Sequence, residues 1–124
     1  MSTPALRRGV VVALRSLQEI SEVGSDRPAP EGQYPYIQIG WDITTGEALA
    51  GDGRSLWARN DIQFSLWEKE ADETGSVARS LVAALNGAKF DGQRLRFSSA
   101  TRVADPDGFD LVHTAITFTH RSPF

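Results

Sequence analysis

One stretch near the middle of the chain has an apolar residue at every second position. The apolar side of this stretch comprises Ile37, Ile39, Trp41 and Ile43. A period of two with one apolar side is typical of a half-buried β-strand. Pro35 stands just before it, and a residue without an amide proton suits the first positions of a strand. The pattern therefore predicts a strand over residues 36–44, whose apolar side needs a cover.

A second alternating stretch follows after a glycine-rich segment. Over residues 57–68, Ile62, Phe64 and Leu66 alternate with residues of the opposite side. Residues 45–54, between the two stretches, are rich in glycine. The two stretches predict an antiparallel hairpin with a long tip. Such tips are held out by a rigid scaffold and often carry function.

Two other stretches have apolar residues at three- and four-residue spacing, which is typical of amphipathic helices. The first begins at a capping signal, Thr3-Pro4, and Gly24 ends it or lies just beyond it. Its apolar stripe comprises Leu6, Val10, Ala13, Leu14, Leu17 and Ile20. The second has Asp72 as its candidate cap and stops at Asn86-Gly87. Its stripe comprises Val77, Leu81, Ala84 and Leu85.

Two further strands are predicted in the last third of the chain. Leu95 and Phe97 alternate with polar residues in one, and residues 110–120 alternate in the other. Asp105-Pro106-Asp107-Gly108 lies between them and is a strong turn sequence. The order helix, strand, strand, helix, strand, strand predicts a single α+β domain over residues 1–124. We expect a mostly antiparallel four-stranded sheet with both helices packed on one face.

Composition narrows the function classes. The chain has 124 residues, 40% hydrophobic and 23% charged, which is typical of a globular domain. A net charge of −3 gives no basis for strong phosphate binding, although it is compatible with a local basic patch. The absence of cysteine removes disulfides, thiolate zinc sites and cysteine nucleophiles. The apolar run at residues 10–14 is too short to span a bilayer, so no membrane association is expected.

No pattern of a catalytic, cofactor or metal site is present, so we expect no enzyme activity, cofactor or metal. His113 and His120 have opposite strand parity and point to opposite faces, as surface or interface residues. The acidic turn at residues 105–110 does not match a calcium loop. Gly51-Asp52-Gly53 lacks the third glycine of a dinucleotide loop and leads into a strand. A small ligand-binding α+β domain is an alternative, but nearly every inward position is apolar.

Some residues are candidates for contacts with other proteins. Trp67 has the parity opposite Phe64 and Leu66, which places it on the exposed sheet face, and exposed tryptophans are favoured interface anchors. Arg94, Arg96 and Arg102 share strand parity and lie on one face if strand pairing is unbroken. That face is either a solvated surface with ion pairs or a contact for an acidic partner or passing nucleic acid. The candidate interface residues are Arg54, Trp57, Trp67, Arg94 and Arg96.

Several of these motifs occur together in a known order. After the first helix come Tyr34-Pro35-Tyr36-Ile37 with Gly40, then Phe64-Ser65-Leu66-Trp67, then Asn86-Gly87, and then the hairpin around Asp105-Pro106-Asp107-Gly108 that ends in Phe118 and Thr119. In this order and spacing the chain resembles the tail terminator, or tail-completion, proteins of long-tailed bacteriophages, prophages and gene transfer agents. The resemblance covers nearly the whole chain.

The resemblance implies a structural protein of a virion or gene-transfer particle, assembled in the cytoplasm of a bacterial host. Such proteins form a homo-hexameric ring that caps the tail tube, stops its polymerisation and joins the tail to the head connector. The implied partners are other copies of the chain, the tail tube protein and the connector or neck protein. DNA passes through the lumen without specific binding. The working parts would be the hairpin tip at residues 47–57, the polar sheet face and the basic strand around Arg94 and Arg96. A neighbouring neck or head–tail connector protein is the alternative.

Overall fold

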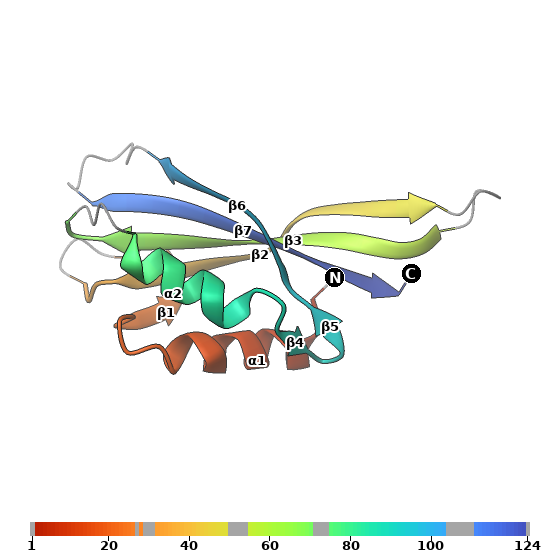
Figure 1. Cartoon of the computed structure of the whole chain (residues 1–124), viewed down its shortest axis with the longest axis horizontal. Coiled ribbons are helices and arrows are strands. Elements are labelled where there is room, and N and C mark those ends of the chain that lie inside the picture. Colours follow the sequence, from red (N-terminus) through yellow and green to blue (C-terminus); the bar gives the residue numbers. More distant parts are fainter. Residues whose placement is uncertain are drawn as a thin grey trace.

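A computed structural model of the chain describes residues 2–26, 28, 32–49, 55–70, 75–103 and 111–123. Its helices are α1 (Pro4–Arg15) and α2 (Ser76–Leu85). Its strands are β1 (Glu22–Gly24), β2 (Tyr36–Leu49), β3 (Ser55–Glu68), β4 (Lys89–Phe90), β5 (Gln93–Arg94), β6 (Arg96–Val103) and β7 (Val112–Pro123). Within these residues, one five-stranded sheet has the order β1-β2-β3-β7-β6, and β4 and β5 form a separate two-stranded sheet (Figure 1).

The main sheet is mixed, so the predicted mostly antiparallel four-stranded sheet is wrong, although the α+β class fits. β1 pairs in parallel with β2, with Glu22 opposite Tyr36, whereas the other neighbours in the sheet are antiparallel. β1 spans only Glu22–Gly24, which is too short to show an alternating pattern. The sequence did not predict β1, because the apolar spacing of α1 continues through Leu17 and Ile20 and suggests a longer helix.

Helix α1 begins where the sequence predicts and ends earlier. Thr3 caps it by accepting a hydrogen bond from the Leu6 amide at 3.1 Å, and Pro4 occupies the first helical position. The helix ends at Arg15, and the following turn still packs Leu17 and Ile20 against the core. Because these two residues pack on the core although they lie after the helix, apolar spacing alone predicts a helix that is too long.

Helix α2 ends before Asn86 as predicted, but its N-cap is Gly75, at a φ of 64°, and the candidate cap Asp72 lies outside the described residues. Both helices cover the same face of the main sheet (Figure 1). None of the helices in the described part of the chain is long and apolar enough to cross a membrane.

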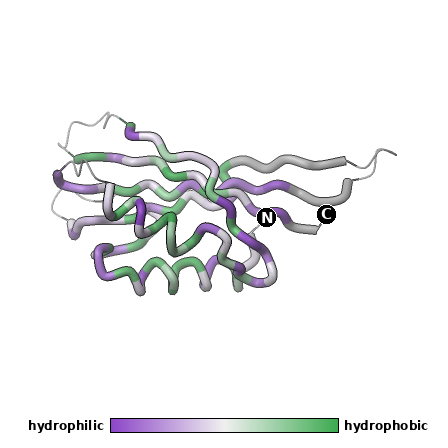
Figure 2. The backbone as a smooth tube through the Cα atoms, in the orientation of Figure 1, coloured by the Kyte–Doolittle hydropathy of each residue, from purple (hydrophilic) through white to green (hydrophobic). Residues whose placement is uncertain are grey.

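The core forms between these helices and the sheet. Apolar positions recur along both helices and along the strands that they cover (Figure 2). Phe64 and Phe118 meet edge to face at a centroid distance of 5.6 Å in its centre. The buried core comprises Leu6, Val10, Leu14, Ile20, Ile37, Ile39, Ile62, Phe64, Leu66, Val77, Leu81, Leu85, Leu95, Ile116 and Phe118. This set confirms most of the two predicted helical stripes, although Ala13 and Leu17 are only partly buried and Ala84 is not in the core. It also confirms the inward positions Ile37 and Ile39 of β2 and Ile62, Phe64 and Leu66 of β3.

Three strands continue past the body as an arm, which we define as residues 44–49, 55–60 and 119–123 (Figure 1). Pairing between β2 and β3 runs out to Leu49 opposite Ser55, and β7 follows β3 as far as Trp57 opposite Pro123. At about 3.3 Å per residue, the outer part of β2 spans about 20 Å. The strands therefore run further than predicted, into the segment that the sequence assigns to a glycine-rich tip.

Candidate functional site

The arm leaves the body at a bulge in β2. Gly40 lies opposite Gln63 and Thr44 lies opposite Asp61, so residues 41–43 face a shorter stretch of β3. Asp42 has a φ of 50°, a left-handed conformation that aspartate tolerates better than most residues. The bulge breaks the predicted alternation beyond Gly40, and Ile43 becomes exposed instead of inward-facing.

Three residues gather around Asp42 and form with it a root cluster, which comprises Ser2, Arg7, Asp42 and His120. The Asp42 carboxylate accepts hydrogen bonds from the Ser2 amide at 2.9 and 3.1 Å, from the Ser2 hydroxyl at 2.7 Å and from Arg7 Nη2 at 3.2 Å. His120 Nε2 lies 3.1 Å from Ser2 Oγ and 3.9 Å from Asp42 Oδ1. The cluster thus ties the amino-terminal end of α1 to β2 and β7 at the root of the arm.

The root cluster holds an ionised aspartate beside a neutral histidine at neutral pH. Burial alone would raise the pKa of Asp42, but hydrogen bonds from Ser2 and Arg7 outweigh it and lower that pKa. Burial lowers the pKa of His120 by more than the neighbouring Asp42 raises it. Ser2 and Asp42 both approach Nε2, whereas a catalytic triad needs its aspartate on the other ring nitrogen. The cluster therefore fits a structural role.

The two histidines point to opposite faces, as predicted, but His120 is not at the surface. Only 1% of its surface is exposed. His113 is half-buried on the other face, where its ring stacks on Trp67 at 4.1 Å between centroids. No group of three or more potential metal-ligating side chains occurs in the part of the chain that the structure describes. The acidic turn at residues 105–110 falls outside that part.

Trp67 lies on the predicted sheet face but is buried there, with 2% of its surface exposed. Its indole nitrogen donates a hydrogen bond to Gln38 Oε1 at 3.2 Å. Tyr36 and Leu111 complete a second, smaller apolar cluster around it. The predicted exposure of Trp67 is therefore wrong, because parity fixes the face of a side chain but not what covers it.

Arg94 and Arg96 belong to different strands, because the chain bends between β5 and β6 at the buried Leu95. Arg94 Nη1 donates to the Gly87 carbonyl at 2.7 Å. Both arginines nevertheless line one polar pocket of about 200 Å³, which we call the basic notch. Its lining residues are Gly92, Gln93, Arg94, Arg96, Thr119, His120 and Arg121.

The predicted alignment of Arg102 with these arginines is wrong. A bulge interrupts the pairing of β6 with β7 between Phe97 and Ser99. Arg96 lies opposite Thr119, whereas Arg102 lies opposite Thr114, and these two threonines have opposite parity on β7. Arg96 and Arg102 therefore lie on opposite faces of the sheet.

Of the other two candidate residues, one lies within the described part of the chain. Arg54 falls outside the described residues. Trp57 lies on β3 within the arm, with its backbone opposite Ala48 and Pro123, and its side chain is not among those described. Along β3, Trp57 and Trp67 are about 30 Å apart. The structure brings Arg94 and Arg96 together, but it does not bring Trp57 and Trp67 together.

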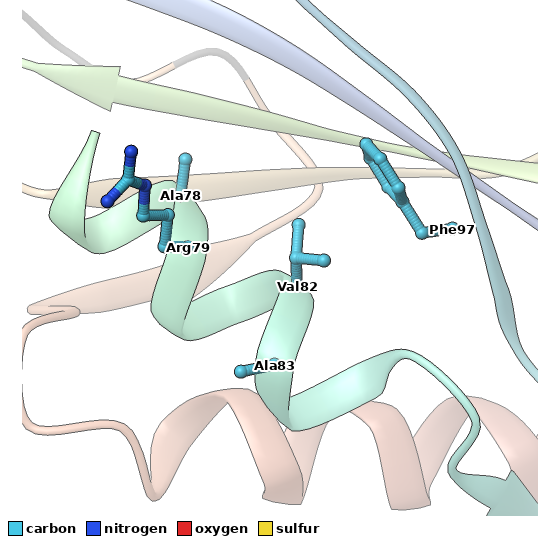
Figure 3. A pocket seen from close by; sticks show the side chains of 5 residues that line it. All are labelled: Ala78, Arg79, Val82, Ala83 and Phe97. Atoms are coloured by element: carbon cyan, nitrogen blue, oxygen red, sulfur yellow. The ribbon is translucent and has the colours of Figure 1, made fainter. Parts of the chain in front are cut away.

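An apolar pocket between α2 and β6 was missed by sequence reasoning. It is lined by Ala78, Arg79, Val82, Ala83 and Phe97 and holds about 360 Å³ (Figure 3). Phe97 leans on Phe118 at 5.8 Å yet remains 40% exposed, because α2 does not cover the sheet edge there. One signal was available in the sequence: Ala78 and Val82 each follow a buried residue of the α2 stripe, which makes the apolar side wider than one stripe.

Comparisons with known proteins give a likeness in fold. No protein-family model matches the chain, and no match was found among curated protein sequences. The chain is similar to one in a solved structure described as "Virion of native gene transfer agent (GTA) particle". The two share 21% sequence identity at a TM-score of 0.70, over 97% of this chain and 96% of that chain. The two chains therefore share a fold over nearly their whole lengths.

Proposed function

We propose that this chain is a structural protein of a phage-like particle, and that it acts there as a tail terminator. The observation that carries the proposal is the shared fold with a chain of a gene transfer agent virion, which leaves almost no part of either chain unmatched. The motif order in the sequence supports the same family. The role is geometric and requires no catalytic group.

The arm is the first proposed contact surface. It extends the sheet beyond the body, so it can reach a neighbouring subunit or the end of a tube without any change in the core (Figure 1). Arg54 and Trp57 are retained as proposed contacts of this hairpin. Trp67, which is buried, contributes by fixing the outer sheet face.

The two edges of the main sheet are the second proposed surface. β1 and β6 lie at opposite edges, and the apolar pocket flanks β6. A contact between different edges of successive copies is heterologous, and such contacts close into a ring when the rotation between copies divides a full turn. We propose a hexameric ring that matches the end of a tail tube and leaves no free site for the next tube subunit.

The proposed position of the ring, at the end of the tail tube, implies the remaining partners. One side of the ring would meet the tail tube protein and the other would meet the head–tail connector. DNA would pass through the lumen, and a net charge of −3 per chain is compatible with passage without adhesion. The protein would work in the tail or neck of the particle after assembly in a bacterial cytoplasm.

Deletion of the gene from a particle-producing host tests this function. If the protein ends tube growth, electron micrographs of the lysate should show tails of uncontrolled length without heads. Wild-type protein supplied from a plasmid should restore tails of one length. Normal-length tails that fail to join heads would instead favour a connector, and intact infectious or gene-transferring particles would refute a structural role.

A further inference from the structure

At the root of the arm, β7 has no hydrogen-bonded strand on one side among the described residues, although β5 lies against it there. β6 pairs with β7 only as far as Arg96 opposite Thr119, and the chain then turns away through Leu95. Beyond Thr119, no described strand pairs with β7 on this side. The basic notch lies at this gap, where hydrophilic positions gather around β5 and the start of β6 (Figure 2).

Positive charge gathers around the notch. Arg94, Arg96 and Arg121 line it, and the strand register sets Arg59 directly opposite Arg121. Like charges in opposite positions destabilise a sheet. Two carboxylates on neighbouring elements are already engaged, since Asp61 pairs with Arg59 at 3.3 Å and Asp91 accepts a hydrogen bond from Thr3 at 2.6 Å. Asp61 thus balances Arg59, and the guanidinium groups that line the notch attract a bound anion.

Two residues of the notch also carry buried polar atoms that lack a partner. Gln93 Oε1 and His120 Nδ1 make no hydrogen bond to any residue that the structure describes. Buried polar atoms are normally paired, and each exception calls for an explanation. Gln93 Oε1 is an acceptor, and so is His120 Nδ1 when Nε2 donates to Ser2, which itself donates to Asp42. The partner that both atoms lack is therefore a donor, such as the main-chain amide of a bound peptide, and not a carboxylate.

We propose that the basic notch binds a carboxylate carried by an extended, acidic segment of a neighbouring protein subunit. Guanidinium groups match the geometry and charge of a carboxylate. A volume of about 200 Å³ accommodates one acidic side chain. The open edge of β7 offers main-chain hydrogen bonds to an extended peptide, a form of recognition that nucleic acid cannot use. The proposal rests on the proposed function only in placing that subunit in the particle.

Fluorescence anisotropy with the full chain tests the notch directly. The probe is a short labelled peptide of alternating valine and glutamate, compared with the same peptide carrying glutamine in place of glutamate. We expect the glutamate peptide to bind at least about tenfold more tightly, which corresponds to about 1.4 kcal/mol. Arg94→Gln combined with Arg96→Gln should reduce that affinity by a similar factor.

A charge-matched double variant, Arg8→Gln with Arg102→Gln, removes exposed arginines that do not line the notch and should bind like the wild type. Because Arg94 also bonds to Gly87, the single variant Arg96→Gln separates loss of binding from a disturbed fold. Equal binding of the two peptides, or equal weakening by the control variant, would overturn the proposal. So would a single-stranded oligonucleotide of the same charge that binds as tightly and depends on the same arginines. The tail-length assay reports on the proposed function separately.

Discussion

Asp42 fixes the position of the arm relative to the body. Its side chain is 10% exposed, and its carboxylate accepts hydrogen bonds from Ser2 and Arg7. Its left-handed backbone places it where β2 bulges, so the turn of the strand and the hydrogen bonds depend on the same residue. Loss of the charge would leave several donors around a group that no longer attracts them.

Asp42→Asn should therefore lower the free energy of unfolding by about 1.5–3 kcal/mol, the range for hydrogen bonds to charged groups. Asparagine tolerates the left-handed backbone, so the change isolates the loss of charge. Asp91→Asn is the matched control, because Asp91 also has a positive φ of 52° but is exposed and accepts one hydrogen bond, from Thr3, where Asp42 accepts several. Urea unfolding at pH 7.5 measures both variants, and equal losses would contradict the role of Asp42.

His120 should make the protein less stable in mild acid. Its pKa is lowered by burial from the ordinary value of 6.5, so between 6.5 and the lowered value the unfolded chain binds a proton that the folded chain does not. The contribution of neutral His120 to the free energy of unfolding is then fully present above about pH 6.5 and declines as the pH falls below that value. The lowered pKa of Asp42 adds a loss only at more acidic pH, below about 3.8.

Urea unfolding between pH 7.5 and pH 5.5 checks this pH dependence. His120→Gln should flatten the slope of the unfolding free energy against pH, whatever it does to stability at pH 7.5. His113→Gln should leave the contribution of His120 in place. An unchanged slope in His120→Gln would show that another group controls stability in this range.

At the scale of elements, β6 is an edge strand whose eight residues are all exposed, beside an apolar pocket. Natural proteins usually protect such edges against unwanted pairing. Here a bulge after Phe97 and exposed arginines at positions 96 and 102 discourage pairing of β6 with another strand edge. An edge protected in this way can still accept a partner with complementary charge.

The apolar pocket should contribute to assembly more than to folding. Phe97→Ser removes a half-exposed ring whose contact with Phe118 is worth about 1 kcal/mol, so the variant should fold. We expect it to be poorly incorporated into particles, because the pocket loses its β6 wall. Val12→Ser, which removes an exposed apolar side chain on α1, should be incorporated normally. Quantitative blotting of purified particles distinguishes the two, and equal incorporation would remove the pocket from the assembly surfaces.

The sequence predicts those parts of the fold that local pattern controls. The Thr3-Pro4 cap, the stop at Asn86 and the inward face of β3 are set by neighbouring residues and appear as expected. The end of α1 and the three-residue strand β1 depend on tertiary contacts, so apolar spacing alone could not place them. Each of the two bulges changes the sheet face on which the following side chains lie. No local sequence pattern marks Asp42 or Ser98 as the position of a bulge.

The candidate site was predictable only in part for the same reason. Arg94 and Arg96 were found as a basic pair, but their common pocket arises from the bend at Leu95 and from β7, far away in sequence. The sequence placed Trp67 on the correct face, but it did not show that His113 and Leu111 cover Trp67 there. Residues that act through distant neighbours, such as Ser2 with His120, carry no sequence signal at all.

On the scale of the whole molecule, the body contains the core that stabilises the fold, and the arm is the part that we propose contacts other proteins. Every residue of the main core lies in the body, whereas the arm extends the sheet past it (Figure 1). Shortening the arm should therefore leave folding intact and remove only contacts with other proteins. Replacement of residues 47–58 by Asn-Gly would close the hairpin directly after Gly46 and before Arg59, which are paired across β2 and β3.

This shortened variant should unfold cooperatively, with a core as stable as that of the wild type apart from the missing strand pairs. In the gene-deletion host it should fail to restore tails of one length. A second variant, in which Asn-Gly replaces only residues 50–54, keeps the last described pair, Leu49 with Ser55, and separates the strands of the arm from its tip. If only the first variant fails, the strands make the contact; if both fail, the tip makes it. Normal tails with the first variant would exclude the arm from tail termination and leave the sheet edges as the proposed contact.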